Sequence, residues 1–370
     1  MKDRVLVAMS GGVDSTVTAV MLKEQGYDVI GITMKTWDYE TSGGNSKETG
    51  CCSLDSINDA RAIAVENGIH HFILDIRNEF GDFVIDNFVE EYLAGRTPHP
   101  CVLCNTHIKW RAMLRRAEQL GCKFIATGHY ARIREDDGRY VVSRGRDAWK
   151  DQAYVLWGLD QESLAKTMLP LGSYTKAEIK KLAQEWGYDS LVKKSESYEI
   201  CFIPDNDYRS FLKRKVDGLE EKVDGGEYVL SDGKVVGRHR GYPFYTIGQR
   251  KGLEVALGKP MYVIDIHPHT NRVVLGEKHE LRRRGMKVRN LNLVKYGNIT
   301  EEMRVLVQIR SGHPGAYATL RPDGNSEFTV IFDHGVEAIA PGQSAAFFEE
   351  NDLLGGGVIA SSFEFEESVN

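Results

Sequence analysis

The sequence predicts an α/β protein in which a doubly wound parallel sheet domain precedes two small β-rich domains. Three observations lead to this fold class. Strand-like and helix-like segments alternate over the first two hundred residues, as in a parallel sheet with helices on both faces. A glycine-rich turn joins the first strand to the first helix. Beyond about residue 205, helical periodicity nearly disappears, and short strand-like pieces with turn signals replace it.

The elements of the first domain, residues 1–205, follow from apolar runs and from helix start and stop signals. Thr175 and Glu178 form a capping-box pattern that opens a helix through Trp186. Ser53 is the expected N-cap of an earlier helix, and Gly68 its stop. The other predicted elements are strands at 5–9, 29–34, 72–75 and 124–127 and helices at 15–25, 54–67, 79–94 and 108–120.

The two β-rich domains are predicted at residues 206–283 and 284–370. A short basic helix ends at 211–215, and turn signals then follow as SDGK, PHTN and PDGN. The arginine run 282–284 separates two strand-rich blocks, which sets the second boundary. The sequence therefore predicts one sheet domain that carries the strand–helix turn and two β domains that follow it.

Composition narrows the class of protein. The chain has 370 residues, with 47 Lys and Arg against 53 Asp and Glu, and a formal charge of -6. No apolar run approaches the roughly 18 residues of a membrane span, and the N-terminus shows no signal-peptide pattern. We therefore expect a cytoplasmic protein. Six cysteines are too sparse for a disulfide scaffold, so buried, metal-binding or catalytic thiols are expected.

The strongest motif is SGGVDS at 10–15, between the first strand and the first helix. Two glycines allow a tight turn, and the helix start supplies amide donors and a positive dipole end, which together suit a pyrophosphate. Ser10 and Ser15 add hydroxyl donors, and Asp14 is expected to act through Mg²⁺. The motif is neither a Walker loop nor a G-x-G-x-x-G dinucleotide loop. The alternative is a capped turn without a ligand.

Three cysteines lie in short sequence motifs that suggest a catalytic or metal-binding role. Cys101 and Cys104 lie in TPHPCVLCN, just ahead of a predicted helix, and Cys201 lies in YEICFIP. A thiol of pKa about 8.5 is only a few per cent thiolate at pH 7, and a helix N-terminus lowers that pKa. Cys104 is therefore expected to be activated, the alternative being a small buried residue. Three further cysteines have no assigned role: the vicinal pair Cys51 and Cys52, and Cys122, which is expected to be buried.

A series of short motifs along the chain carries a family resemblance. In order they are SGGVDS at 10–15, GRTP at 95–98, LCN at 103–105, IK at 108–109, ATGHY at 126–130, KDQ at 150–152, ICFI at 200–203, TIGQRKGL at 246–253 and PGQS at 341–344. This order resembles the tRNA-specific 2-thiouridylase family, within the PP-loop ATP pyrophosphatase superfamily, over nearly the whole chain.

The resemblance implies a thiolation reaction. ATP would adenylate the C2 oxygen of the wobble uridine in tRNAs for Lys, Glu and Gln, with Asp14 at the phosphate loop. Sulfur would arrive as a persulfide from a cysteine desulfurase or a sulfur-relay protein. Cys201 matches the family's persulfide-carrying cysteine. Cys104 matches the second cysteine, which would attack the persulfide and leave a Cys104–Cys201 disulfide.

Alternatives remain open at this point. Some family members have aspartate where this chain has Cys101, so Cys101, Cys104 and Cys201 could instead hold a 4Fe–4S cluster, or zinc together with His107. We prefer the persulfide route. Beyond thiolation, the sequence also admits an ATP-dependent amide-forming ligase of a small metabolite, and a nucleotide sensor or RNA-binding protein without catalysis.

The resemblance also implies binding residues. The ATP site would contain Ala8, Met9, Ser10, Gly11, Gly12, Val13, Asp14, Ser15, Met34 and Gly128. The tRNA contacts would be His99, Pro100, Cys101, His129, Lys150, Asp151, Gln152, Arg310, Ser311 and Gln343.

Charge distribution agrees with an RNA partner despite the negative total. Basic residues cluster at Arg209, 213–215, 238–240, 250–251 and 282–284, with aromatic residues between the middle clusters. This mixture suits a phosphate backbone and unstacked bases. Acidic residues gather near the C-terminus. The charge of the whole chain is therefore not the charge of the surface expected to meet tRNA.

Overall fold

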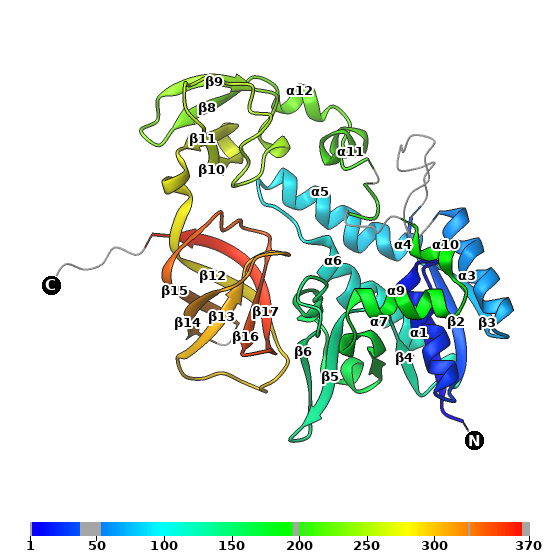
Figure 1. Ribbon diagram of the computed structural model, residues 1–370. Coiled ribbons are helices and arrows are strands. Elements are labelled where there is room, and N and C mark those ends of the chain that lie inside the picture. Colours follow the sequence, from blue (N-terminus) through cyan, green and yellow to red (C-terminus); the bar gives the residue numbers. More distant parts are fainter. Residues whose placement is uncertain (1, 38–52, 195–199, 204, 325, 365–370) are drawn as a thin grey trace. The chain divides into compact units, whose positions relative to one another are not determined.

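The computed structural model describes residues 2–37, 53–194, 200–203, 205–324 and 326–364 (Figure 1). The chain forms two compact units, each assembled from separate stretches. The first takes in Met1–Val84, Cys101–Asp207 and Asn351–Leu354. The second takes in Ile85–Pro100, Tyr208–Glu350 and Gly355–Asn370. The predicted domain boundaries at 205 and 283 stay a prediction.

The first unit is built on a five-stranded sheet in the order β3-β2-β1-β4-β7. Its strands are β1 (Arg4–Ala8), β2 (Asp28–Lys35), β3 (His70–Asp75), β4 (Phe124–Ala126) and β7 (Thr167–Met168). Neighbouring strands pair in parallel throughout. The chain runs outward from β1 to β3 and then returns to the other side of β1 with β4. Ligands of such sheets bind at the carboxyl ends of the strands where this order reverses.

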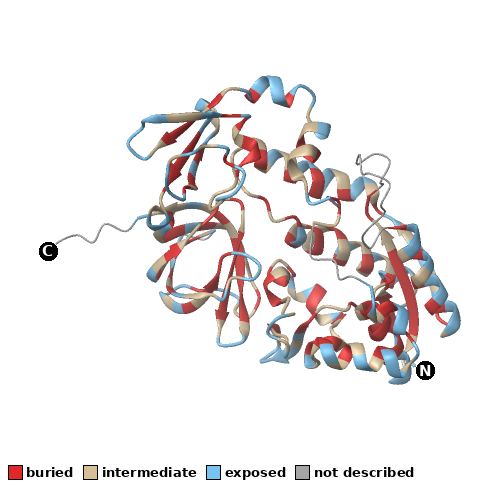
Figure 2. Ribbon diagram, turned by 45° about the horizontal axis from the view of Figure 1, so that its top comes forward, coloured by how far each residue is buried: buried red, intermediate tan, exposed pale blue. Residues whose placement is uncertain are grey.

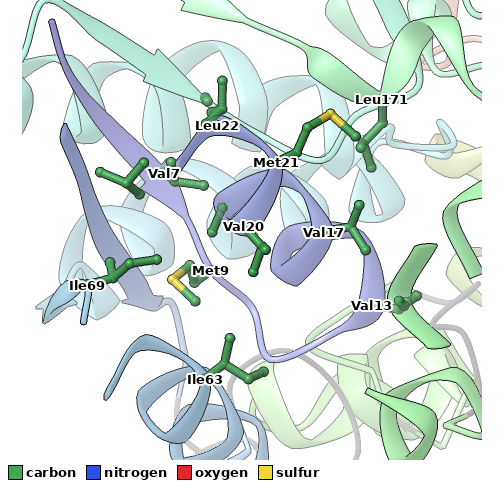
Figure 3. Packing of buried hydrophobic residues seen from close by; sticks show 14 of the residues in the cluster. Val7, Met9, Val13, Val17, Val20, Met21, Leu22, Ile63, Ile69 and Leu171 are labelled. Carbon is green, nitrogen blue, oxygen red and sulfur yellow. The ribbon is translucent and has the colours of Figure 1, made fainter. Parts of the chain in front are cut away.

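Helices cover the sheet and share its core. Val7 and Met9 of the β1 segment pack with Val17 and Val20 of α1 (Val13–Glu24) (Figure 3). Most of α1 is buried, so it is a core helix rather than an amphipathic surface helix. The remaining longer helices of the unit are α3 (Leu54–Glu66), α7 (Trp110–Gln119) and α9 (Lys176–Glu185), and the shorter ones are α4 (Arg77–Phe80), α6 (Pro100–Leu103), α8 (Gln161–Ala165) and α10 (Asp189–Val192).

Two predicted helix starts are confirmed by their caps. The Ser53 side chain accepts a hydrogen bond from the Ser56 amide and begins α3. Thr175 and Glu178 form both halves of a capping box at α9. Polar side chains that satisfy the first amides of a helix fix its start whatever packs around it. These boundaries could therefore be predicted from the sequence.

Two other predicted helices differ from the structure. The single helix expected at 79–94 is α4, a π-helical segment η1 (Gly81–Ile85), and α5 (Asp86–Leu93), which belongs to the second unit. The helix expected at 108–120 begins earlier, with α6 and a π-helical segment η2 (Cys104–Lys109) before α7. A π-turn closes i→i+5 bonds, which apolar periodicity of 3.6 residues does not reveal.

A β-hairpin in the first unit was not predicted. It consists of β5 (Ala131–Asp136) and β6 (Arg139–Arg144). Asp137 and Gly138 form its two-residue turn, and both have positive φ, at 49° and 74°. An Asp-Gly pair with this backbone is a strong hairpin signal. The signal is present in the sequence and was missed.

The second unit contains a four-stranded sheet and a closed six-stranded barrel (Figure 1). In the barrel, β12 pairs with both β15 and β17, which closes the ring. Two of the predicted turn signals join β8 to β9 and β10 to β11. The sheet has the order β10-β11-β8-β9, with β8 (Gly226–Leu230), β9 (Val235–His239), β10 (Tyr262–His267) and β11 (Arg272–Gly276). The barrel strands are β12 (Arg282–Leu293), β13 (Met303–Gln308), β14 (Ala316–Asp323), β15 (Glu327–Glu337), β16 (Ser344–Glu349) and β17 (Asp352–Phe363).

The predicted fold class, a parallel sheet domain followed by β-rich domains, is confirmed. Buried residues follow the strands in the sheet and in the barrel, with exposed residues in loops and on outer helix faces (Figure 2). No helix in the described ranges is long and apolar enough to cross a membrane. The remaining short elements are α11 (Tyr208–Lys215), α12 (Leu219–Val223) and the 3₁₀ turns η3 (Ala153–Leu156), η4 (Pro170–Ser173), η5 (Tyr242–Phe244), η6 (Pro268–Thr270) and η7 (Lys278–Leu281).

Candidate nucleotide and thiol site

The phosphate loop connects β1 to α1 in the first unit. Gly12 is the N-cap residue of α1 and lies in extended backbone. Because glycine has no side chain, no capping group competes with a ligand for the first amides of the helix. The Met9 amide donates to the Ile32 carbonyl at 2.8 Å, which holds the start of the loop against β2. The loop therefore presents a helix N-terminus at the edge where anions bind.

Two serines brace this loop. The Ser15 hydroxyl accepts from the Ser10 amide at 3.1 Å and donates to the Gly12 carbonyl at 3.0 Å. The Ser10 hydroxyl donates to the Ser15 oxygen at 3.3 Å. These bonds order the turn before any ligand arrives, so less conformational entropy is lost on binding.

Two glycines are required by close approaches. Gly11 has φ of 72°, and a Cβ there would lie 2.1 Å from the Ser56 carbonyl oxygen. A Cβ at Gly128 would lie 3.1 Å from both the carbonyl carbon and the Cβ of Asp14. A larger residue at either position would displace the loop or its aspartate, because neither neighbour is a flexible side-chain end.

Asp14 is held by two side chains that sequence reasoning did not identify. The Lys176 ammonium lies 2.8 and 2.7 Å from its two carboxylate oxygens. The Tyr130 hydroxyl donates to the same carboxylate at 2.7 Å. Lys176 is only 8% exposed, so this ion pair is only weakly screened by solvent. The capping box of α9 predicted where the helix starts but not which carboxylate its first residue would meet.

A cavity of about 230 Å³ opens at the predicted edge of the sheet. Its walls come from the ends of β1 and β2 and from the segment after β4, on either side of the reversal in strand order. Seven of the predicted ATP residues line it: Ala8, Met9, Ser10, Asp14, Ser15, Met34 and Gly128. The other three, Gly11, Gly12 and Val13, do not line it, and the Val13 side chain packs in the core (Figure 3).

His129, predicted to contact tRNA, lies in the wall of this cavity. Its Nδ1 is 2.8 Å from the Thr127 hydroxyl, and its ring packs against Trp110. Burial lowers the pKa of His129 to about 3, and the charge of Lys109 acts in the same direction. The imidazole is therefore neutral at physiological pH.

The predicted tRNA segment 150–152 has structural as well as surface roles. The Asp151 carboxylate pairs with Arg144 at 2.7 Å and accepts from the Gly145 and Ala153 amides. Gln152 lines the cavity. The Asp151 side chain thus orders the loop, and Gln152 faces the nucleotide side.

The predicted tRNA residues of the second unit divide in the same way. The Gln343 amide donates to the backbone carbonyls of Thr97 and Pro98, at 3.2 and 2.8 Å. His99 lies 2.9 Å from the Ser344 hydroxyl, and burial lowers its pKa to about 4. These side chains order a loop. Of the other predicted tRNA residues in this unit, Arg310 and Ser311 are exposed and Pro100 is buried; Cys101, which belongs to the first unit, is exposed.

The thiols occupy different surroundings. Cys104 is buried and Cys201 is half-buried. The prediction that Cys104 lies just ahead of a helix is wrong, because the helix begins at Pro100, a residue favoured in the first turn. Cys101 therefore lies in the first turn, and Cys104 begins the π-turn that follows. The segment after Cys201 is anchored by Phe202, which is 1% exposed.

Desolvation raises the pKa of the Cys101 thiol even though part of the side chain remains accessible, and the charge of Lys109 lowers it. Cys122 is half-buried rather than fully buried, and desolvation raises its pKa. Cys51 and Cys52 lie outside the described residues.

Lys109 belongs both to the wall of the nucleotide cavity and to the segment that carries Cys101 and Cys104. It lines the cavity, and its charge lowers the pKa values of both His129 and Cys101. It ends the π-turn that Cys104 begins, five residues earlier. The motif IK at 108–109 contains this lysine, but the sequence alone does not indicate its role.

No group of three or more His, Cys, Asp or Glu side chains is arranged as metal ligands in the described part of the chain. The arrangement of Cys101, Cys104 and Cys201 there does not fit a 4Fe–4S cluster, nor does it fit zinc with His107. No chemical step is therefore derived through either metal group.

Comparisons with known proteins identify the family. Three family models match in succession: a "tRNA methyl transferase HUP domain" at residues 3–205, a "tRNA methyl transferase PRC-barrel domain" at 209–277 and an "Aminomethyltransferase beta-barrel domain" at 283–359. The tRNA-specific 2-thiouridylase MnmA of Amoebophilus asiaticus is 62% identical over 98% of this chain and 96% of its own length. The chain belongs to the tRNA-specific 2-thiouridylase family. The family predicted from the motifs is confirmed.

Further members of the 2-thiouridylase family match over similar lengths. That of Cytophaga hutchinsonii is 59% identical over 98% of this chain and 99% of its own length. That of Carboxydothermus hydrogenoformans is 47% identical over 97% of this chain and 98% of its own length. The family models are described by methyl transfer and the relatives by thiolation, but both the HUP-domain model and the relatives name tRNA.

Proposed function

We propose that this member of the 2-thiouridylase family transfers sulfur to C2 of the wobble uridine in cytoplasmic tRNAs for Lys, Glu and Gln, with ATP converted to AMP and diphosphate. The observation that carries the proposal is the cavity at the β1–β4 reversal. It brings the phosphate loop, Asp14 and Lys109 into one site within the unit that holds Cys104 and Cys201.

ATP fits this cavity by chemistry. The phosphates would meet the first amides of α1 and the hydroxyls of Ser10 and Ser15. The adenine would lie against apolar lining such as Met34 and Met113. Lys176 and Tyr130 occupy three acceptor positions of the Asp14 carboxylate, so Asp14 would hold Mg²⁺ through its remaining one, together with substrate phosphates and water. The bound ion would supply charge neutralisation at the phosphates.

Adenylation makes the uridine C2 oxygen a good leaving group. The terminal sulfur of a persulfide on Cys201 would attack C2, and AMP would depart with the electron pair of the broken C–O bond. The Cys104 thiolate would then attack Sγ of Cys201, which breaks the bond between Sγ and the transferred sulfur, releases the thiolated base and forms a Cys104–Cys201 disulfide. A cellular dithiol would reduce that disulfide. A cysteine desulfurase or sulfur-relay protein would renew the persulfide.

Lys109 would support both the adenylation step and the sulfur-transfer step. A cation that lines the nucleotide cavity stabilises negative charge on the departing AMP. Burial raises the pKa of Cys101, and the charge of Lys109 opposes that rise, which supports a field that extends to the thiol segment. A thiolate is stabilised in such a field.

The persulfide route and an iron–sulfur cluster on Cys101, Cys104 and Cys201 differ in whether the enzyme needs iron. Anaerobic purification followed by iron and sulfide analysis separates the two routes. We expect substoichiometric iron and full activity with a persulfide donor. Cluster absorption that disappears together with activity in Cys101→Ala would contradict the persulfide route.

The proposed activity is tested with purified protein, ATP, unmodified tRNA-Glu and either sulfide or a persulfide donor. We expect 2-thiouridine in the digested tRNA only when ATP is present. Absence of 2-thiouridine with both sulfur sources would contradict the proposed function.

A further inference from the structure

Trp149 is the most exposed large hydrophobic side chain in the described part of the chain. It is 97% exposed, and the next, Val65, is 73% exposed. A single exposed apolar residue requires no explanation by itself. The indole of Trp149 is distinguished by the way its loop is built and by what that loop is attached to.

The backbone around Trp149 is held in a fixed turn. One Asp147 oxygen accepts from the Trp149 amide at 3.0 Å, and the other accepts from the Lys176 amide at 2.9 Å. The Lys150 amide donates to the Asp147 carbonyl at 3.1 Å. The Asp147 carboxylate thus fixes the turn and joins it to α9. An indole displayed on an ordered turn binds with little entropy loss, because its backbone is already fixed.

The same loop is attached to the nucleotide site at both ends. Lys176, whose amide is held by Asp147, places its ammonium on Asp14. At the other end, Gln152 accepts from the Tyr130 amide, and the Tyr130 hydroxyl donates to Asp14. All of these residues belong to the first unit. Trp149 therefore stands on a turn that is positioned by the residues around the phosphate loop.

The charges near the indole favour a polyanion. Arg146 precedes it by three residues with a side chain that is 57% exposed, and Lys150 follows it directly. Both Asp147 oxygens accept from backbone amides, and Glu178 pairs with Arg146, which still leaves the Arg146 side chain accessible to a phosphate. A planar ring between two basic residues is suited to stacking on an unpaired base while the cations meet its phosphates.

We propose that Trp149 is a stacking platform for an unpaired base in the tRNA loop that carries the target uridine. The inference rests on the proposed function, because an enzyme that modifies a base must take that base out of its stack. A stacked neighbour held by Trp149 would keep the opened loop in place beside the cavity. The aromatic face accepts any base, so the contact contributes affinity and positioning rather than sequence choice.

The test compares Trp149→Ala and Trp149→Phe in the full chain, with unmodified tRNA-Glu binding measured at several salt concentrations. We expect Trp149→Ala to raise the Kd for tRNA about tenfold with an unchanged salt slope, and Trp149→Phe to stay within about threefold. Lys150→Gln is the matched control for charge and should reduce the salt slope by about one. Because the indole is almost fully exposed, neither Trp149 substitution should change thermal stability.

Fluorescence supplies a second reading. Trp37, Trp110 and Trp157 are buried, and Trp186 packs against the core, so Trp149 dominates the solvent-exposed indole emission. We expect tRNA to quench that emission in the wild type and to have little effect in Trp149→Phe. Quenching that is the same in both proteins would overturn the proposal.

The binding assay needs neither ATP nor sulfur, so its outcome is separable from that of the proposed function. If wild-type protein binds tRNA through Trp149 but never forms 2-thiouridine, the proposed function fails and the stacking contact stands. Unchanged tRNA affinity in Trp149→Ala overturns the stacking contact. Loss of affinity for a sulfur-donor protein, with tRNA affinity unchanged, would also overturn it and would assign the surface to a protein partner.

Discussion

Asp14 shows how single residues prepare the phosphate loop for a nucleotide. Lys176 and Tyr130 hold its carboxylate in a fixed orientation, and Gly128 leaves room for it. The ion pair is partly buried, with 10% of the lysine side chain and 33% of the aspartate side chain exposed. Removing one partner of such a pair leaves a charge in poorly solvated surroundings.

Lys176→Met tests this arrangement. We expect tRNA-dependent diphosphate release to fall more than tenfold, because Asp14 loses its orientation, and the free energy of unfolding to fall by about 2 kcal/mol. Lys181→Met is the matched control on the same helix, since Lys181 is 77% exposed in its pair with Glu185. Equal effects of the two substitutions would contradict a special role for Lys176.

His129 makes a prediction about acid stability. Its pKa is lowered to about 3 in the folded chain, against about 6.5 when unfolded. Between these values the unfolded chain binds more protons, so stability is full above pH 6.5 and is lost as pH falls toward 3. One such group costs about 2 kcal/mol between pH 7 and pH 5. Denaturant unfolding of His129→Gln should show a smaller loss over that interval, and an equal loss would refute the assignment.

At the scale of elements, the π-helical segment η2 connects Cys104 in sequence to Lys109, which lines the nucleotide cavity. Cys104 begins it and Lys109 ends it. The sequence predicted a helix only from residue 108, and it could not predict the wider turn, since no residue pattern in the chain distinguishes i→i+5 from i→i+4 bonding. Likewise, Thr175 and Glu178 revealed the start of α9, but Lys176 finds Asp14 only through tertiary packing.

Lys109→Met tests whether the lysine charge acts on the thiol segment. Because the lysine charge lowers the pKa of Cys101, its removal should raise that pKa, and alkylation of Cys101 should require a higher pH. Mass spectrometry of iodoacetamide-treated protein over a pH series measures the shift. Arg111→Met, two residues further along the chain, is the control and should leave the profile in place. A Lys109→Met profile identical to wild type would contradict the proposed field.

At the scale of the whole molecule, the alternation of strands and helices predicted the parallel sheet, and its loss after residue 205 predicted the β-rich remainder. Both signals are local, since they depend on periodicity and turns. Two features depend on the three-dimensional fold and not on local sequence. Asp14 and Lys176 are in contact although they are 162 positions apart. The charged residues around Trp149 cannot be inferred from the formal charge of -6 of the whole chain. The motifs therefore predicted the family, whereas the side chains that contact the motif residues became known only from the fold.

Cys201→Ser tests whether sulfur transfer can be separated from the binding of ATP and tRNA. We expect the variant to bind ATP and tRNA as wild type does and to form no 2-thiouridine, because the persulfide carrier is missing. Cys122→Ser, which changes a half-buried thiol without an assigned role, should retain activity. Thiolation by Cys201→Ser at the wild-type rate would exclude Cys201 as the carrier.

The most direct measurement of the central claim is the ratio of AMP formed to 2-thiouridine formed when the purified protein acts on unmodified tRNA-Glu with ATP and a persulfide donor. Chromatography of the nucleotides and mass spectrometry of the digested tRNA give the two amounts from one reaction. The proposed mechanism predicts one AMP for each 2-thiouridine and neither product when tRNA is omitted. Formation of 2-thiouridine without AMP, or with ADP in its place, would contradict adenylation of the uridine.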